Sequence, residues 1–474
     1  MSKLKASDIL ENIDCTYVAG NKDVSCEGCV IDSRQVTDKS MFVAFNGENL
    51  NANKFVDKAI DDGASILVVT DDISSVTQDK ANTSDCCIIR CKDDDAQQFM
   101  LDCAKLYRAL NKQWKVVCVT GSVGKTTTKE MCACAVASQK SVTYTKGNYN
   151  NLIGMPMTLL SAKDTDDILV LETGMNHFNE LRQLSNSARP DIALITNIGT
   201  SHIGILGSKE NIARSKAEIL ESMDEDGVLG LTSFDEYSSF IKDTFATPKG
   251  INVVHVGNSN KDDIWVEDVK LNEDGCASFK LMYKDGDVYF VELGLPGKAI
   301  VSDFELAMVV VDSLGLDRAI AIKAIENMKS SAMRLEVEQN EGTPRIINDT
   351  YNASPTSMAE ALDVLSAMEC KGKRICVLGE MGEMGDEAPL LHSLVGAYAA
   401  AKPIDMLCTI GDSLAECIVN GARGVGMSED KIVSFNSVDE ALKVLKPVLE
   451  EDDLVLVKAS RAAELENFSK GVLS

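Results

Sequence analysis

Histidine is scarce in this chain of 474 residues, with four copies, and the 47 basic residues are outnumbered by 73 acidic ones, giving a formal net charge of −26. So few histidines argue against a metal centre built from several of them. The acidic excess argues against a nucleic-acid partner, because phosphates require a basic face. It does not exclude a small anionic substrate, since a few lysines and backbone N–H groups can bind one locally.

Long apolar runs are also missing. No stretch approaches the roughly 18 consecutive apolar residues of a membrane span, and residues 1–13 contain no apolar signal core. The 15 cysteines are scattered, apart from Cys26 and Cys29 at metal-site spacing, which lack the second pair that would complete a zinc site. We therefore expect reduced thiols and a cytoplasmic protein.

The length predicts about three domains. We expect an α/β fold with a small N-terminal α/β domain (residues 1–93), a central domain with a P-loop-type, mostly parallel sheet and helices on both faces (94–328), and a C-terminal Rossmann-like α/β domain (329–474). Period-two alternation predicts antiparallel hairpins at the edge of the central domain over residues 262–294. Strands are expected at 42–45, 66–69, 168–171, 191–195, 345–348, 375–378, 406–410 and 454–457, and helices at 53–62 and 96–110.

The most informative segment is residues 116–129, an apolar β-branched run followed by a small-residue turn, Lys125-Thr126 and a helical pattern. In such a segment the backbone N–H groups point at an anion, the lysine adds positive charge, and the threonine offers its hydroxyl to Mg²⁺. Val119 stands where the usual pattern has glycine. The segment predicts a nucleoside triphosphate site, and an ordinary turn with a surface lysine is the alternative. The expected phosphate-binding residues are Gly121, Ser122, Val123, Gly124, Lys125, Thr126 and Thr127.

Three further residues have chemistry that suits a metal site near this loop. Glu172 ends an expected strand, where an acid can reach Mg²⁺ directly or through water, or simply be solvated. His202 follows the next strand and is either a contributor to that site or a hydrogen-bonded loop residue. Lys216 lies in an ordinary helical pattern that favours a solvated side chain, and a buried lysine beside metal ions would have to be deprotonated or modified.

Two polar segments offer directional hydrogen bonds. Asn148, Asn150 and Asn151 either contact sugar or phosphate oxygens or build a turn. The segment 349–355 follows an expected strand, and its Ser-Pro end predicts a helix start. Its acid and amide either meet a nucleotide held by the central domain or form a plain capping loop. The glycine-rich segment 379–385 lacks the spacing of a dinucleotide fingerprint, so no nicotinamide site is predicted.

Together, these segments resemble the Mur ligases, over about residues 31–461. The phosphate loop has the family's form Thr-Gly-Ser-x-Gly-Lys-Thr, which accounts for Val119. The segments 147–156, 349–355, 378–385 and 457–461 match family motifs in order, and Tyr351-Asn352-Ala353 indicates the type that adds D-alanyl-D-alanine to UDP-N-acetylmuramoyl-tripeptide.

The resemblance implies roles for individual residues. Lys125 and Thr126 would hold the phosphates of ATP and Mg²⁺, Glu172 and His202 would serve a second Mg²⁺, and Lys216 would be a carbamate. Arg334 and Asp349 would reach the nucleotide from the third domain, which must close over the other two. The residues expected to bind substrate are Ser33, Arg34, Asn148, Asn150, Asn151, Tyr351 and Asn352.

The chain departs from the family pattern at three places. Asp303 stands where the family has the asparagine associated with adenine, residues 51–53 replace an Asp-Gly-His motif, and Ala459 replaces a glycine. None of these changes affects the phosphate or metal positions.

The implied activity is ATP-driven amide formation through an acyl phosphate, with ATP and Mg²⁺ as cofactors and with UDP-N-acetylmuramoyl-tripeptide and D-alanyl-D-alanine as small-molecule partners. We expect a monomer. The alternatives are a Mur-type ligase that adds the third amino acid, a folate-type polyglutamate ligase, and a non-catalytic nucleotide-binding relative.

Overall fold

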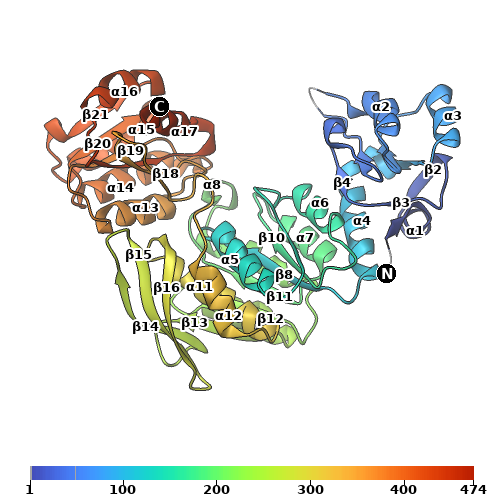
Figure 1. Ribbon diagram of the computed structural model, residues 1–474, viewed down its shortest axis with the longest axis horizontal. Helices are drawn as coiled ribbons and strands as arrows, with labels where there is room; N and C mark the ends of the chain where they lie inside the picture. Colours follow the sequence, from blue (N-terminus) through green and yellow to red (C-terminus); the bar gives the residue numbers. More distant parts are fainter. Residues whose placement is uncertain (1–2, 48–49) are drawn as a thin grey trace.

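The structure is a computed structural model that describes residues 3–47 and 50–474. Three blocks of sheet and helix follow one another along the chain, and the first and last lie at opposite ends of the molecule with the central block between them (Figure 1). The predicted three-domain α/β fold is confirmed. The boundaries after residues 93 and 328 stay predictions.

The N-terminal block contains a five-stranded sheet of order β2-β7-β6-β5-β4, in which only β2 runs antiparallel to its neighbour. All four residues of β6 are fully buried, as expected for a parallel strand that is covered on both faces. The elements are β1 (Leu4–Lys5), α1 (Ala6–Asn12), β2 (Cys15–Gly20), β3 (Ser25–Cys26), β4 (Cys29–Val30), β5 (Met41–Val43), α2 (Val56–Asp61), β6 (Ile66–Val69), α3 (Ser75–Thr83) and β7 (Cys87–Cys91).

The central block is built on a nine-stranded sheet of order β16-β15-β14-β13-β12-β11-β8-β10-β9. Alternate residues of β8 pack on opposite faces: Val117 and Val119 contact the core under α5 and α11, whereas Val116 and Cys118 contact the core under α4, α6 and α7. The helices of this block are α4 (Ala96–Leu110), α5 (Lys125–Ala137), α6 (Gly154–Leu160), α7 (Glu180–Ala188), α8 (Ile203–Leu206), α9 (Lys209–Ala217), α10 (Ser238–Ile241), α11 (Ile300–Ser313) and α12 (Arg318–Glu326). Its strands are β8 (Lys115–Thr120), β9 (Val142–Tyr144), β10 (Ile168–Glu172), β11 (Ile192–Ile195), β12 (Val228–Thr232), β13 (Asn252–Gly257), β14 (Ile264–Leu271), β15 (Cys276–Tyr283) and β16 (Val288–Pro296).

The predicted hairpins are confirmed at the edge of this sheet. β14, β15 and β16 pair antiparallel, with tight turns around Gly275 and Gly286, both at positive φ. The first turn touches the C-terminal block, where the N–H of Glu369 donates to the carbonyl of Glu273 at 2.7 Å.

The C-terminal block has a six-stranded sheet of order β17-β18-β22-β19-β20-β21, parallel except for β17. The predicted helix start is confirmed, because the Ser354 hydroxyl caps α13 and Pro355 occupies its first position. The elements are β17 (Glu336–Glu338), β18 (Arg345–Asp349), α13 (Pro355–Ala367), β19 (Arg374–Leu378), α14 (Ala388–Ala400), β20 (Met406–Ile410), α15 (Ser413–Gly424), β21 (Ile432–Phe435), α16 (Val438–Leu445), β22 (Leu454–Lys458) and α17 (Glu466–Leu473).

The topology predicts where a ligand binds. In the central sheet, β8 lies between β10 and β11: the chain runs from β8 to β9 and β10 on one side and then crosses to β11 and β12 on the other. Such a switch point opens a crevice at the carboxyl ends of the strands. Among the described residues, no helix is long and apolar enough to cross a membrane.

Candidate active site

A cavity of about 560 Å³ lies at this switch point. Its walls come from the carboxyl ends of β8, β10 and β11 in the central block and of β18 and β22 in the C-terminal block. This volume is in the range of small-molecule sites. The cavity brings together the predicted residues Gly121, Ser122, Val123, Gly124, Lys125, Thr126, Thr127, Asn148, Asn150, Asn151, Glu172, His202, Lys216, Asp303, Arg334, Asp349, Tyr351 and Asn352.

The loop between β8 and α5 is braced by its neighbouring strand. Gly121 lies so close to Thr196 that an added Cβ would come within 1.8 Å of the threonine hydroxyl. Gly124, at φ 84°, is the residue from which α5 begins. Asn197 accepts from the N–H of Val123 at 3.0 Å, so the loop's shape is fixed before any ligand binds.

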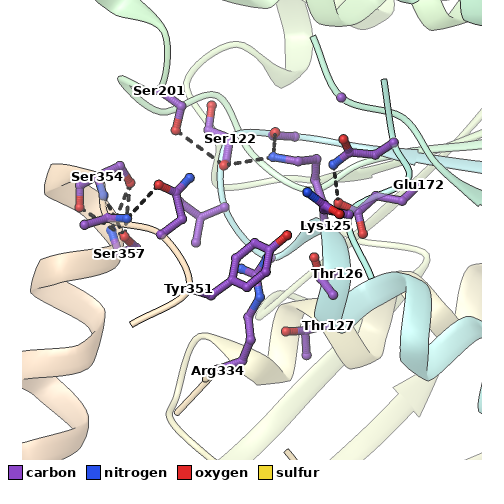
Figure 2. A pocket seen from close by; sticks show the side chains of 18 of the residues that line it. Ser122, Lys125, Thr126, Thr127, Glu172, Ser201, Arg334, Tyr351, Ser354 and Ser357 are labelled. Carbon is purple, nitrogen blue, oxygen red and sulfur yellow. Dashed lines mark hydrogen bonds between the residues drawn. The ribbon is translucent and has the colours of Figure 1, made fainter. Parts of the chain in front are cut away.

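Lys125 lies over this loop. Its ammonium donates to the carbonyls of Gly121 (2.7 Å) and Ser122 (3.2 Å) (Figure 2). Burial lowers the pKa of Lys125, and the nearby Glu172 carboxylate opposes that shift. The residue predicted as the phosphate-binding lysine is thus a half-buried cation at the N-terminus of a 13-residue helix, which suits a multiply charged anion.

Glu172 stands beside Lys125 at the end of β10 and is 2% exposed. One carboxylate oxygen accepts from the side-chain amide of Asn150 at 2.8 Å. The other, Oε2, is buried and has no hydrogen-bond partner within the described part of the chain. A buried carboxylate oxygen is costly without a partner, so these residues fit a divalent cation at this position.

Lys216 differs from what the sequence pattern favoured. That pattern indicated a solvated lysine, but the side chain is 2% exposed and lines the cavity. Burial, followed by the charge of Lys125, lowers its pKa well below the usual range. Helical spacing is the sequence signal that could have predicted this burial. Lys216 lies on the same helix face as the buried Ile212 and Ile219.

Of the two roles left open for the asparagine segment, the structure shows the turn, and contact with sugar or phosphate oxygens stays a prediction. Asn151 builds a turn, since its side-chain oxygen accepts from the N–H groups of Ile153 and Gly154 at the start of α6. Asn150, by contrast, holds Glu172, and Asn148 lines the cavity.

The C-terminal block supplies the opposite wall. The Arg334 guanidinium lies 4.1 Å from the centre of the Tyr351 ring, and the pair faces Thr126 and Thr127 at the start of α5 (Figure 2). Asp349 forms a buried ion pair with Lys458 at 2.5 Å. Lys458 also donates to the carbonyl of Asn352 at 3.0 Å, so it fixes this segment.

Charged cavity residues to which the sequence assigned no role include Lys458, Glu360 and Glu383. Burial raises the pKa of Glu360 to about 7. Glu383 and Lys458 lie in segments that match family motifs, but neither residue was assigned a role from the sequence. All three reach the cavity only through the tertiary fold.

Two family models match this chain: the Mur ligase middle domain over residues 119–311 and the glutamate ligase domain of Mur ligases over residues 333–461. Together they cover more than half of it. The chain belongs to the Mur ligase family.

Several proteins named as Mur ligases are similar to this chain over nearly their whole length. The UDP-N-acetylmuramoyl-tripeptide–D-alanyl-D-alanine ligase of Bacillus subtilis is 32% identical over 446 residues, which cover 94% of this chain and 93% of the relative. The ligase of the same name from Escherichia coli is 30% identical, with 94% and 93% covered. The crystal structure of MurF from Acinetobacter baumannii superposes with a TM-score of 0.87 at 26% identity, covering 100% and 99% of the two chains. The predicted family is confirmed.

Asp303, predicted to stand where Mur ligases have an asparagine, lies beside the phosphate loop. The carboxyl group is buried, accepts from the Thr128 hydroxyl at 3.0 Å, and packs against Gly124, where an added Cβ would lie 2.4 Å from it. Burial raises its pKa well above the usual range. Asp303 therefore braces α11 against the phosphate loop of this Mur ligase.

Two predicted residues lie outside the cavity of this Mur ligase. Ser33 is buried in the N-terminal block, and Arg34 pairs with Asp32 at 2.6 Å on its surface. Neither lines the cavity. Cys26 and Cys29, the cysteine pair at metal-site spacing, are both buried free thiols.

Proposed function

We propose that this Mur ligase joins D-alanyl-D-alanine to UDP-N-acetylmuramoyl-tripeptide, with ATP as the energy source. The observation that supports this most directly is the cavity itself. It unites the phosphate loop of the central block with Arg334, Tyr351 and Asn352 of the C-terminal block. A reaction between a phosphorylated acid and an amine needs such a two-sided site.

The chemistry proceeds in two steps. A carboxylate is a poor electrophile, because it would have to expel oxide. Transfer of the γ-phosphoryl group of ATP to the tripeptide's terminal carboxylate breaks the bond to ADP and forms an acyl phosphate. The free amine of D-alanyl-D-alanine then attacks the acyl carbon, phosphate leaves with the bonding electron pair, and the amine loses a proton as the amide forms.

Lys125 and the loop N–H groups would stabilise the charge on the transferring phosphoryl group, which is the main requirement of this reaction class. The Thr126 hydroxyl would hold one Mg²⁺, and Glu172 and His202 would serve a second. Bound there, Mg²⁺ would neutralise phosphate charge. The unpartnered oxygen of Glu172 supports this assignment.

Lys216 would bear a carbamate. Its depressed pKa supplies the neutral amine that reacts with carbon dioxide, with release of a proton. The product is an anion, which suits a position beside metal ions better than a repelled ammonium would.

On the opposite wall, Arg334 and Asp349 would contact the nucleotide, whereas Asn148, Asn150, Asn151, Tyr351 and Asn352 would contact the muramoyl peptide. Ser33 and Arg34 would hold the uridine nucleotide on the N-terminal block. Closure of the blocks around both substrates would exclude water that otherwise hydrolyses the acyl phosphate. A monomeric, cytoplasmic enzyme remains our prediction.

The test is phosphate release from ATP and Mg²⁺, with the UDP-muramoyl-tripeptide and D-alanyl-D-alanine added singly and then together. We expect release only with both, accompanied by a pentapeptide product in the mass spectrum. Release with an amino acid or a folate polyglutamate acceptor instead would favour one of the other ligases. Failure to bind ATP would favour a non-catalytic relative.

A further inference from the structure

The central and C-terminal blocks meet at two glycines. Gly204 in α8 lies against Gly385 in the short helix η7 (Gly385–Glu387), and a Cβ added to Gly204 would come within 2.5 Å of the Gly385 nitrogen. Neither position tolerates a side chain, so the two backbones are in direct contact. α8 and η7 lie at the edge of the cavity, next to His202 and Glu383.

His202 and Glu383 form the polar part of the same contact. Nδ1 of His202 lies 2.6 Å from Oε2 of Glu383, which is ion-pairing distance although the ring is not aligned as in a hydrogen bond. Both residues have left-handed backbone conformations, with φ of 63° and 64°. Such conformations are strained for residues other than glycine and concentrate at functional sites. Here, two of them touch across a domain boundary.

We propose that Glu383 is a positioning residue for His202, and that it acts only when the two blocks are joined at the Gly204–Gly385 contact. The proposal relies on the proposed function for the place of His202 beside the metal. In addition, the C-terminal block contributes to the metal site without binding the metal. Its Glu383 sets the orientation of His202, which belongs to the central block.

The chemistry of imidazole supports this role. A carboxylate at one ring nitrogen holds the proton there, fixes the ring, and leaves the other nitrogen to bind a metal. With Nδ1 facing Glu383, Nε2 is the nitrogen left for the cation. When the blocks separate, Glu383 moves away with η7 and the ring loses this constraint.

The first test measures binding of Mn²⁺, as a probe for the Mg²⁺ site, by its EPR signal in the presence of a non-hydrolysable ATP analogue. We expect Glu383→Ala to weaken Mn²⁺ binding roughly 10- to 100-fold. Glu383→Gln, which keeps an oxygen beside the ring nitrogen, should recover part of the loss. Glu387→Gln is the matched control, since it removes an exposed acid from η7, the short helix that follows Glu383. Wild-type affinity in Glu383→Ala would overturn the proposal.

The second test separates the blocks without altering a cavity side chain. Gly204→Ala forces a Cβ into the contact, and we expect it to weaken Mn²⁺ binding as Glu383→Ala does and to enlarge the molecule in small-angle X-ray scattering. Gly382→Ala is the control, because a Cβ there meets nothing within 4 Å. The double variant Gly204→Ala/Glu383→Ala should lose no more than either single variant. Losses that multiply would contradict a shared cause.

Thermal unfolding of every variant checks that the fold is kept. These measurements involve no turnover. If the wild-type protein makes no amide product, the proposed function fails, whereas the Mn²⁺ comparison between variants still decides the role of Glu383.

Discussion

The two outer domains relate to the cavity in opposite ways. The C-terminal domain supplies one wall, including Arg334, Tyr351 and the buried pair of Asp349 and Lys458. Of the described residues from 3 to 93, none lines the cavity, and Arg34 is paired only with its neighbour Asp32 on the surface. One domain is therefore already part of the site, whereas the other would have to reach it by movement or through a long substrate.

The largest effect on turnover is expected from a substitution in the central domain, where the proposed reaction takes place. Lys125→Ala removes the cation at the phosphate loop and should lower turnover at least about a thousandfold, with the fold kept. Phosphate release and thermal unfolding measure the two properties. Lys140→Ala, an exposed lysine beyond the end of α5, is the control. Near-normal turnover in Lys125→Ala would refute the assignment of the site.

On the C-terminal side, Lys458→Met leaves the Asp349 carboxylate buried without its partner. We expect a loss of about 3–5 kcal/mol in the free energy of unfolding, measured by urea denaturation. Replacing both residues, with Asp349→Asn added, should recover much of that loss, because no charge is then left unpaired. Equal stability of the single and double variants would argue against a true ion pair.

Glu360, on the same wall, is expected to make stability depend on pH. Its pKa rises from an ordinary value of 4.5 to about 7, mainly through burial. The stabilisation is complete below pH 4.5 and is lost as pH rises to about 7, a change of about 3 kcal/mol. Glu360→Gln should flatten the unfolding free energy across this window. An unchanged profile would contradict the raised pKa.

The smallest effect on stability is expected in the N-terminal domain. The Arg34 side chain is 85% exposed, so Arg34→Ala should leave the melting temperature unchanged despite the 2.6 Å pair with Asp32. If Arg34 binds the uridine nucleotide, KM for the UDP substrate should rise about tenfold with kcat kept. A change in kcat alone would instead indicate that Arg34 contributes to closure of the domains around the substrates.

The parts of the molecule that local sequence determines were predicted well. The helix 96–110 and the strands 66–69 and 406–410 are found with those bounds, since each has a clear period and a cap or turn at its ends. The phosphate loop was also predictable, because its glycines and lysine lie within one short segment. The burial of Lys216 was not, since it depends on helices that are distant in the sequence.

The three charged cavity residues to which the sequence assigned no role were missed for the same reason. Lys458, Glu360 and Glu383 come from three different elements of the C-terminal domain and acquire a role only where that domain meets the central one. Asp303 was noticed as a departure from the family. Its contact with Gly124 and its raised pKa follow only from its burial in the folded protein.

The hairpin contact described above limits how the C-terminal domain can open. That domain is attached to the central one by the chain after α12 and at the hairpin turn, where Glu369 bonds to Glu273 and Arg345 pairs with Asp274. The glycine contact near the cavity is a further attachment. A rigid body held at two points keeps one rotational degree of freedom, about the line that joins them. Release of the glycine contact alone would therefore produce a swing about a single axis, close to Met333 and Leu335, whose positive φ values mark the chain link.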